Sequence, residues 1–386
     1  MKINYLKYLL ILTLVFPALA SKAQQHDEDL LNVLVKKNVI SEQEADSLRS
    51  DEAIKAQKKK DQDVANQHSI TIGTRALQIS GLIQTEYEGF EQSTKTNTFL
   101  LHRARLDVKG NISDDWNYEV YTEFAGATPK LLDAYTTYKI ADYLKVTAGQ
   151  FKVPFSYESL VSDSDLEFID RTQVVNALSG RSTDVIGNQN GRDIGGELTG
   201  SFAKLNDHYL FDYYFAVVNG AGYDVTTDNN NHKDIAGRLA IHPIQNLTIA
   251  ADFYHGIDLF TVAAGTAKAN TYNLRNRQGI DGRYVWKKLS LTAEYDKGTD
   301  AHLNRNGWYG QAAYFVWSNK LQLAARYDTF DPTQTITTDR TTDYTGGVNY
   351  FFNKWAKFTV DYIDAREQTA TQIKNNLFEA QLQLVF

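Results

Sequence analysis

Polar and apolar side chains alternate with a period of two from Leu77 to the last residue, Phe386. Successive side chains of a β-strand point to opposite faces, so each alternating segment predicts a strand with one apolar and one polar face. The apolar side chains of the last segment are Phe378, Ala380, Leu382, Leu384 and Phe386, separated by Glu379, Gln381 and Gln383. The alternation therefore predicts an all-β fold over this part of the chain.

A soluble β-sandwich shows the same alternation, but three features favour a transmembrane antiparallel β-barrel. Segments of roughly 10 residues repeat about sixteen times up to the end of the chain, as membrane strands require. The polar faces carry Arg, Lys, Asp and Glu together, which suits a water-filled lumen. Aromatic residues gather near the ends of the segments, at Trp116 and Tyr118, at Trp308 and Tyr309, and at Phe351, Phe352 and Trp355.

The predicted connections alternate in length. Short turns at 113–115, 140–142, 204–207 and 318–320 alternate with longer polar stretches at 152–191, 220–233, 256–270 and 330–342. Short periplasmic turns and longer extracellular loops are typical of outer-membrane barrels. After residue 24 no apolar run reaches the ~20 residues of a spanning helix. A chain of this kind enters a membrane only as a closed barrel.

The composition agrees with strands and excludes several classes of protein. There are 23 Tyr and 19 Phe but only 5 Pro, a balance that favours strands. The net charge of −7 argues against a nucleic-acid partner, because nucleic-acid binders carry a basic excess. Cysteine is absent, which excludes disulfides, thiolate metal sites and a cysteine nucleophile.

The N-terminus predicts export. Lys2 and Lys7 accompany a short apolar stretch, and small residues follow up to Ala23. This pattern predicts a cleavable signal peptide over residues 1–23.

Residues 24–70 differ from the rest of the mature chain because they are rich in charged residues and lack aromatic ones. Leu30, Leu31, Leu34 and Val35 have helical spacing, and Ser41 with Glu44 forms the sequence pattern of a helix capping box. We predict a short periplasmic helical or coiled-coil extension and linker over 24–70, with a weakly ordered tail as the alternative. The barrel is then predicted to occupy residues 71–386.

The longest stretch without alternation is 152–191. A loop of this length is usually functional or disordered. If it folds into the barrel it narrows the lumen and acts as a constriction loop; an ordinary external loop is the alternative. Charges at a constriction set ion preference, because the low-dielectric wall focuses their field. The first half of the loop is acidic, with Glu158, Asp163, Asp165, Glu167 and Asp170.

Basic residues occur in this loop and on the polar faces of the predicted strands. The loop and its ends carry Lys152, Arg171, Arg181 and Arg192, and the strands carry Arg103, Arg105, Lys109, Arg283 and Arg326. Guanidinium groups bind phosphate-like anions through paired hydrogen bonds, so these residues are candidates to line a path for anions. Equally open is that they pair with polar-face carboxylates and brace the wall, namely Glu119, Glu123, Asp133, Glu197, Glu294 and Asp328.

No motif of an enzyme or a cofactor site is present. The eight His show no metal-ligand spacing such as H-x-x-x-H, and neither a G-x-S-x-G elbow nor a phosphate-binding P-loop occurs. We therefore predict that the protein is not an enzyme and needs no cofactor or metal.

Several short segments, in this order, resemble the phosphate-selective porin O/P family over most of the mature length. They are Arg103–Gly110, Trp116–Tyr118, Leu132–Tyr135, Gly149–Ser156, Phe168–Arg171 and Gly191–Gly195, and the most specific is Gly-Gln-Phe-Lys-Val-Pro-Phe-Ser at 149–156. The resemblance implies a sixteen-stranded trimeric porin with an inward-folded third loop and basic lumen residues that pass anions. By motif, Lys152, Arg171 and Arg192 are the positions that best correspond to pore-lining residues of the family.

The leading hypothesis is a porin in the outer membrane of a Gram-negative bacterium. It would contact lipid and lipopolysaccharide, form a homotrimer, and let small hydrophilic solutes diffuse, with anions or phosphate preferred. The alternative is a structural or adhesive outer-membrane barrel that is tethered through its N-terminal extension. The terminal aromatic Phe386 on the outward face of the last strand favours outer-membrane insertion under either hypothesis.

Overall fold

The computed structural model describes residues 36–37, 69–72, 75–182, 184–205, 208–369 and 373–386. The predicted signal peptide, 1–23, and nearly all of the predicted extension, 24–70, lie outside these residues. No helix among the described residues is long and apolar enough to cross a membrane.

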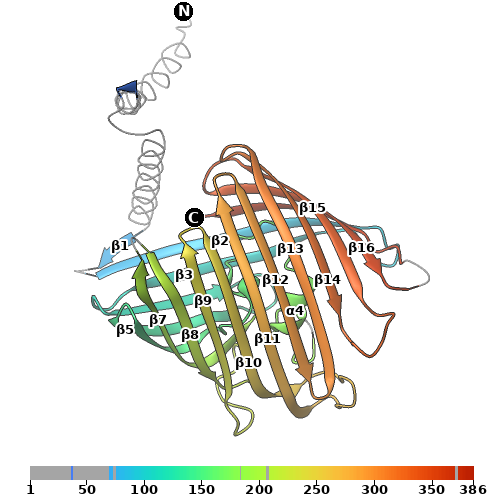
Figure 1. The fold of residues 1–386 in the computed structure, drawn as a ribbon, viewed down its shortest axis with the longest axis horizontal. Helices are drawn as coiled ribbons and strands as arrows, with labels where there is room; N and C mark the ends of the chain where they lie inside the picture. The colour runs from blue at the N-terminus through green and yellow to red at the C-terminus, as the bar shows by residue number, and fades with distance from the viewer. Residues whose placement is uncertain (1–35, 38–68, 73–74, 183, 206–207, 370–372) are drawn as a thin grey trace, which may run out of the picture. The chain divides into compact units, whose positions relative to one another are not determined.

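Sixteen antiparallel strands in the described residues close into one barrel (Figure 1). The first eight are β2 (Arg75–Phe90), β3 (Thr98–Asn111), β4 (Trp116–Glu123), β5 (Lys130–Ala141), β6 (Leu144–Lys152), β7 (Arg192–Leu205), β8 (His208–Val218) and β9 (Asp234–Ile244). The second eight are β10 (Leu247–Phe260), β11 (Thr271–Trp286), β12 (Leu289–Asp300), β13 (Leu303–Trp317), β14 (Leu321–Asp331), β15 (Thr341–Phe351), β16 (Ala356–Glu367) and β17 (Leu377–Val385). A short strand, β1 (Ser69–Ile72), precedes them.

Each strand pairs with its neighbours in sequence, and β17 pairs with β2 to close the ring. The predicted all-β transmembrane barrel of sixteen strands is therefore confirmed. The boundaries differ in places: β10 continues to Phe260, so the loop predicted at 256–270 covers only 261–270. The alternation continues through Gly256, which is a strand residue here and not the start of a loop.

The burial of the side chains is the reverse of that in a soluble protein. Along β12, Leu291 and Tyr295 are 40% and 39% exposed, whereas Glu294 and Asp296 are 3% and 1% exposed. Apolar side chains thus face outward and charged ones face inward on the same strand. In water such a surface would be unfavourable because burial of apolar area drives folding, whereas in a bilayer the outward apolar band contacts lipid.

Aromatic side chains pair with one another on the outer surface. The Trp308 and Tyr327 ring centroids lie 4.8 Å apart, and Tyr327 contacts Tyr344 at 5.3 Å. Toward the short turns, Trp116 and Tyr138 lie 4.9 Å apart. Aromatic rings with polar edges are favourable at the boundary between lipid and water, so these groups fit the two girdles of a membrane barrel.

The terminal residue belongs to the seam between the last and first strands. Phe386 N–H donates to the Gly81 carbonyl at 3.0 Å, and Gly81 N–H donates to the Phe386 carbonyl at 2.7 Å. A Cβ atom on Gly81 would lie 2.3 Å from the Phe386 ring, so only glycine leaves room for the ring at this point.

Candidate functional site

The 153–191 loop lies inside the barrel. It contains two short helices, α3 (Tyr157–Leu160) and α4 (Gln173–Leu178), and α4 packs against β12, β13 and β14 (Figure 1). Val174, Val175 and Leu178 are fully buried against the inner wall. Their core cluster also contains Phe155, Ala236, Tyr254, Tyr309 and Phe330. Burial of this apolar face gives the loop a reason to fold inward.

Carboxylates of the inner wall hold the loop by its backbone. Glu294 accepts hydrogen bonds from the N–H groups of Tyr157 and Glu158 at 2.8 and 3.1 Å. Asp328 accepts from Gln173 N–H, the first residue of α4, at 2.7 Å. The free N–H groups at a helix start carry partial positive charge, so these carboxylates stabilise both helices.

The same pattern extends to two further wall carboxylates and to the other end of α4. Asp252 accepts from Ser156 N–H at 3.2 Å, and Asp361 accepts from Ile169 N–H at 2.7 Å. At the end of α4, the Leu178 carbonyl accepts from Arg275 Nη2 at 3.0 Å and from Arg277 Nε at 2.9 Å. Much of the acidic wall is thus occupied with fixing the loop.

Six of the predicted basic residues come together where the loop faces β3 and the β6–β7 pair, and we call them the basic cluster: Arg103, Arg105, Lys152, Arg171, Arg181 and Arg192. Asp163 of the loop lies at its centre. Both Arg105 and Arg171 donate to Asp163, and Arg103 Nη2 lies 3.5 Å from it. Burial alone would raise the pKa of Asp163, but Arg171, Arg103 and Arg105 hold it well below its usual range.

The other three members of the basic cluster differ in how far they are neutralised. Arg192 donates to both oxygens of Asp133, at 2.9 and 2.8 Å. Within the described part of the chain, Lys152 donates only to the carbonyls of Leu160 and Val161, at 2.9 and 3.2 Å.

Arg181 has no carboxylate partner among the described residues. It donates to the Ser159 hydroxyl at 2.9 Å, to the Ser159 carbonyl, and to Asn190 Oδ1 at 3.0 Å. Burial, reinforced by the positive charges of Arg171 and Arg192, lowers the pKa of Arg181 well below its usual range.

Gly191 permits this arrangement. Its φ is +65°, and a Cβ atom there would lie 2.7 Å from the Ser159 hydroxyl and 3.0 Å from Arg181 Nε. A side chain at this position would be strained and would displace Arg181.

Two cavities border the basic cluster. The first, of about 450 Å³, is lined by Arg103, Arg105, Arg171 and Arg181 together with the carboxylates Glu123, Asp163 and Asp170. The second, of about 320 Å³, is lined by Lys109, Lys152 and Arg192, by the carboxylates Asp107, Glu119 and Asp133, and by Ser162 and Ser164. The loop segment 162–164 therefore lies between the two cavities, and cationic side chains line each cavity.

Of the remaining three predicted residues, Lys109 borders the second cavity, whereas Arg283 and Arg326 contact other parts of the wall and loop. Lys109 Nζ is 3.1 Å from Asp107 and its side chain is 42% exposed. Arg283 donates to Thr292 Oγ1 at 3.0 Å and lies 3.8 Å from Glu167. Arg326 donates to the Asp170 carbonyl at 2.8 Å and covers the Phe168 ring. These three residues do not share one site.

The interpretation that the basic residues pair with carboxylates of the wall describes part of the structure. Of the six carboxylates considered as partners, Glu123 pairs with Arg105 at 2.6 Å and Asp133 pairs with Arg192. Among the described residues, Glu294 and Asp328 bind loop backbone, and Glu119 accepts from the Tyr135 hydroxyl at 2.7 Å. The sequence did not predict the pairing of Asp163 with the basic residues, since its contact with Arg105 joins positions 58 apart in sequence.

A closed barrel with an outward apolar band, an inward charged face and an internal loop defines the porin class of outer-membrane channels. The sequence family described as phosphate-selective porin O and P matches residues 77–386, and the chain belongs to this family. It is accordingly a porin of the Gram-negative outer membrane that allows passive diffusion.

Solved structures support the fold at low sequence identity. OmpT, an outer-membrane protein of Vibrio cholerae, matches with a TM-score of 0.60 at 15% identity, covering 82% of this chain and 99% of OmpT. Salmonella typhi OmpF in complex with daunomycin gives 0.60 at 14%, covering 82% of this chain and 100% of OmpF. The channel DcaP of Acinetobacter baumannii gives 0.57 at 13%, covering 81% and 97%. A comparison with curated protein sequences found no match.

Proposed function

We propose that this porin prefers anions, with phosphate among them, and that they interact with the basic cluster in the lumen. The observation that supports the proposal most strongly is the imbalance of charge at the cluster. Among the described residues, the six cationic side chains form ion pairs with three carboxylates, Asp163, Glu123 and Asp133, and Asp170 also lines the adjoining cavity. Among the described residues, Arg181 and Lys152 donate hydrogen bonds to uncharged groups.

The surroundings explain why the net charge of the chain, −7, does not oppose this preference. The field that a passing ion meets depends on the charges lining its path rather than on the total. Asp252, Glu294, Asp328 and Asp361 lie where backbone N–H groups of the loop screen them. The arginines next to the 450 Å³ cavity carry donors suited to phosphate oxygens.

We also propose that the protein assembles as a homotrimer and contacts lipid and lipopolysaccharide through its outer surface. OmpT of Vibrio cholerae has been solved in a trimer form, which supports the assembly by analogy. The outward band of exposed apolar residues supports the lipid contact. The proposal assigns the protein no catalytic role.

The test is inhibition of chloride current by phosphate through single channels in a planar bilayer. Phosphate should reduce the chloride current of the wild type, and Arg181→Gln should need at least about a threefold higher concentration for the same reduction, because one charge-assisted contact is lost. Arg366→Gln is the matched control, since Arg366 is exposed and pairs with Asp364 away from the basic cluster. Equal inhibition of wild type and Arg181→Gln would refute the proposed site.

A further inference from the structure

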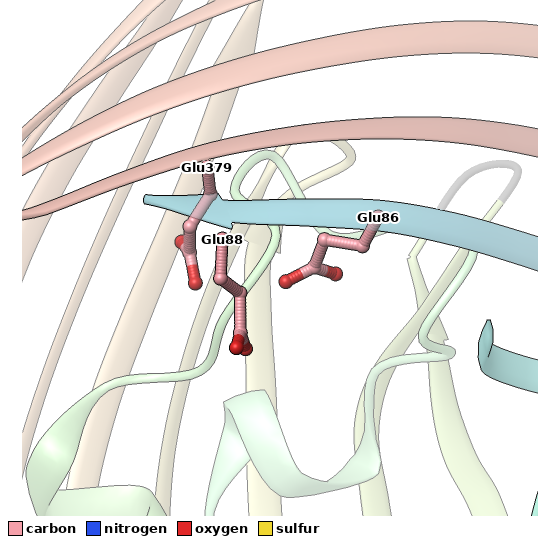
Figure 2. Close-up of side chains that lie close together, drawn as sticks. All are labelled: Glu86, Glu88 and Glu379. Atoms are coloured by element: carbon pink, nitrogen blue, oxygen red, sulfur yellow. The ribbon is translucent and has the colours of Figure 1, made fainter. Parts of the chain in front are cut away.

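A second charged cluster lies at the seam that closes the barrel, on β2 and β17. Glu86 and Glu88 belong to β2 and Glu379 to β17. One carboxylate oxygen from each of the three lies within 4.8 Å of the others. Figure 2 shows the three side chains projecting to the same side of the two strands and converging on one space. We call these three residues the seam cluster.

The strand register forces these charges together. Glu379 lies directly opposite Glu88 across the β2–β17 pair, and on its other side it lies opposite Asp361 of β16. Like charges placed directly opposite each other destabilise a sheet. The negative charges around Glu379 therefore destabilise the sheet unless a positive charge compensates them.

Neighbouring residues compensate only part of it. One oxygen of Glu86 contacts His102 Nδ1 at 2.5 Å and accepts from Gln381 Nε2 at 2.8 Å. Lys95, a cation that acts on Glu88, is exposed. Asp170 and Asp361 add further negative charge around Glu379.

Glu379 is the observation that points to a ligand. It is 0% exposed, and neither of its carboxylate oxygens has a hydrogen-bond partner among the described residues. The second oxygen of Glu86, which is 3% exposed, also has none. A buried carboxylate without partners is very unfavourable, and such groups are normally paired or coordinate a metal.

The geometry suits a hard divalent cation. Calcium takes oxygen ligands at about 2.3–2.6 Å, so two ligands on opposite sides of one ion lie about 4.6–5.2 Å apart. Three oxygens within 4.8 Å of one another lie within about 2.8 Å of a common point, so small side-chain rotations bring all three to the calcium–oxygen distance. Calcium tolerates irregular geometry and accepts water as further ligands, whereas magnesium requires a near-ideal octahedron. A set of carboxylate oxygens also disfavours zinc, which prefers nitrogen and sulfur.

We propose that one calcium ion binds between Glu86, Glu88 and Glu379 and links the first and last strands of the barrel. The positive ion is coordinated by all three carboxylates and so offsets the repulsion between them. It stabilises the closed barrel, independently of which solutes the pore passes.

The test uses full-length protein refolded in detergent free of lipopolysaccharide, because lipopolysaccharide itself binds calcium. After treatment with EDTA, isothermal titration with Ca²⁺ should show one site per chain. The Tm should rise as Ca²⁺ is added, since a ligand that binds only the folded state stabilises it by mass action. Glu379→Gln should weaken binding at least tenfold and remove the dependence of Tm on Ca²⁺.

A second signature separates this site from a merely structural role of Glu379. In EDTA, Glu379→Gln should be more stable than the wild type because it removes repulsion, whereas in Ca²⁺ the order should reverse. Glu88→Gln provides the same comparison if Glu379→Gln does not fold, and Glu197→Gln on β7 is the control that should behave as the wild type. A wild-type Tm that is equal in EDTA and Ca²⁺, or that follows pH but not Ca²⁺, would overturn the proposal.

Discussion

At the scale of single residues, Asp163 organises the lumen. In the sequence it is one of five carboxylates in the first half of the loop, and it counts against an anion preference. In the structure its carboxylate is shared by Arg105 and Arg171, so it fixes their positions while leaving the cluster positive. Local sequence patterns do not reveal such a role, because it depends on how the loop folds against β3.

Asp163→Asn tests this role. The variant removes the charge that holds three guanidinium groups together, so we expect stronger anion selectivity together with lower stability. Loss of one partner from a buried charged pair costs about 3–5 kcal/mol. Reversal potentials would report the selectivity, and urea unfolding in lipid vesicles the stability. An Asp163→Asn channel with unchanged selectivity and stability would show that Asp163 is not a central partner.

At the scale of elements, the strands were predictable and the loop only in part. The alternation is local, so it locates strands without knowledge of the fold. The predicted end of one strand before Gly256 was wrong, because β10 continues through Gly256 to Phe260. The helices α3 and α4 have four and six residues, too few for a periodic signal. The apolar pair Val174–Val175 was visible in the sequence, but its contact surface on β13 and β14 was not.

Leu178→Ala tests whether this apolar face holds the loop inside the barrel. Leu178 is fully buried, and truncation of a buried leucine costs about 2–5 kcal/mol. We expect a looser loop, seen as higher single-channel conductance and more current noise. The matched control is Leu382→Ala on the outer surface, where the side chain is 39% exposed and the conductance should not change. Equal conductance and noise in both variants would contradict the anchoring role.

At the scale of the whole molecule, the reversed burial along the strands distinguishes a membrane barrel from a soluble sandwich. The alternation of polar and apolar residues is the same in both cases, whereas in the closed ring the charged faces are buried and the apolar faces are exposed. The seam cluster also depends on closure of the ring. Glu88 and Glu379 are 291 residues apart in the sequence and become neighbours only through the pairing of β2 with β17. Their juxtaposition could not be predicted without the register.

The most direct test of the central claim is the zero-current potential of the wild-type channel in a KCl gradient across a planar bilayer. The positive basic cluster predicts a reversal potential whose sign reports faster chloride than potassium movement, with the preference reduced in Arg181→Gln. A reversal potential of the opposite sign, reporting potassium preference, would contradict the account.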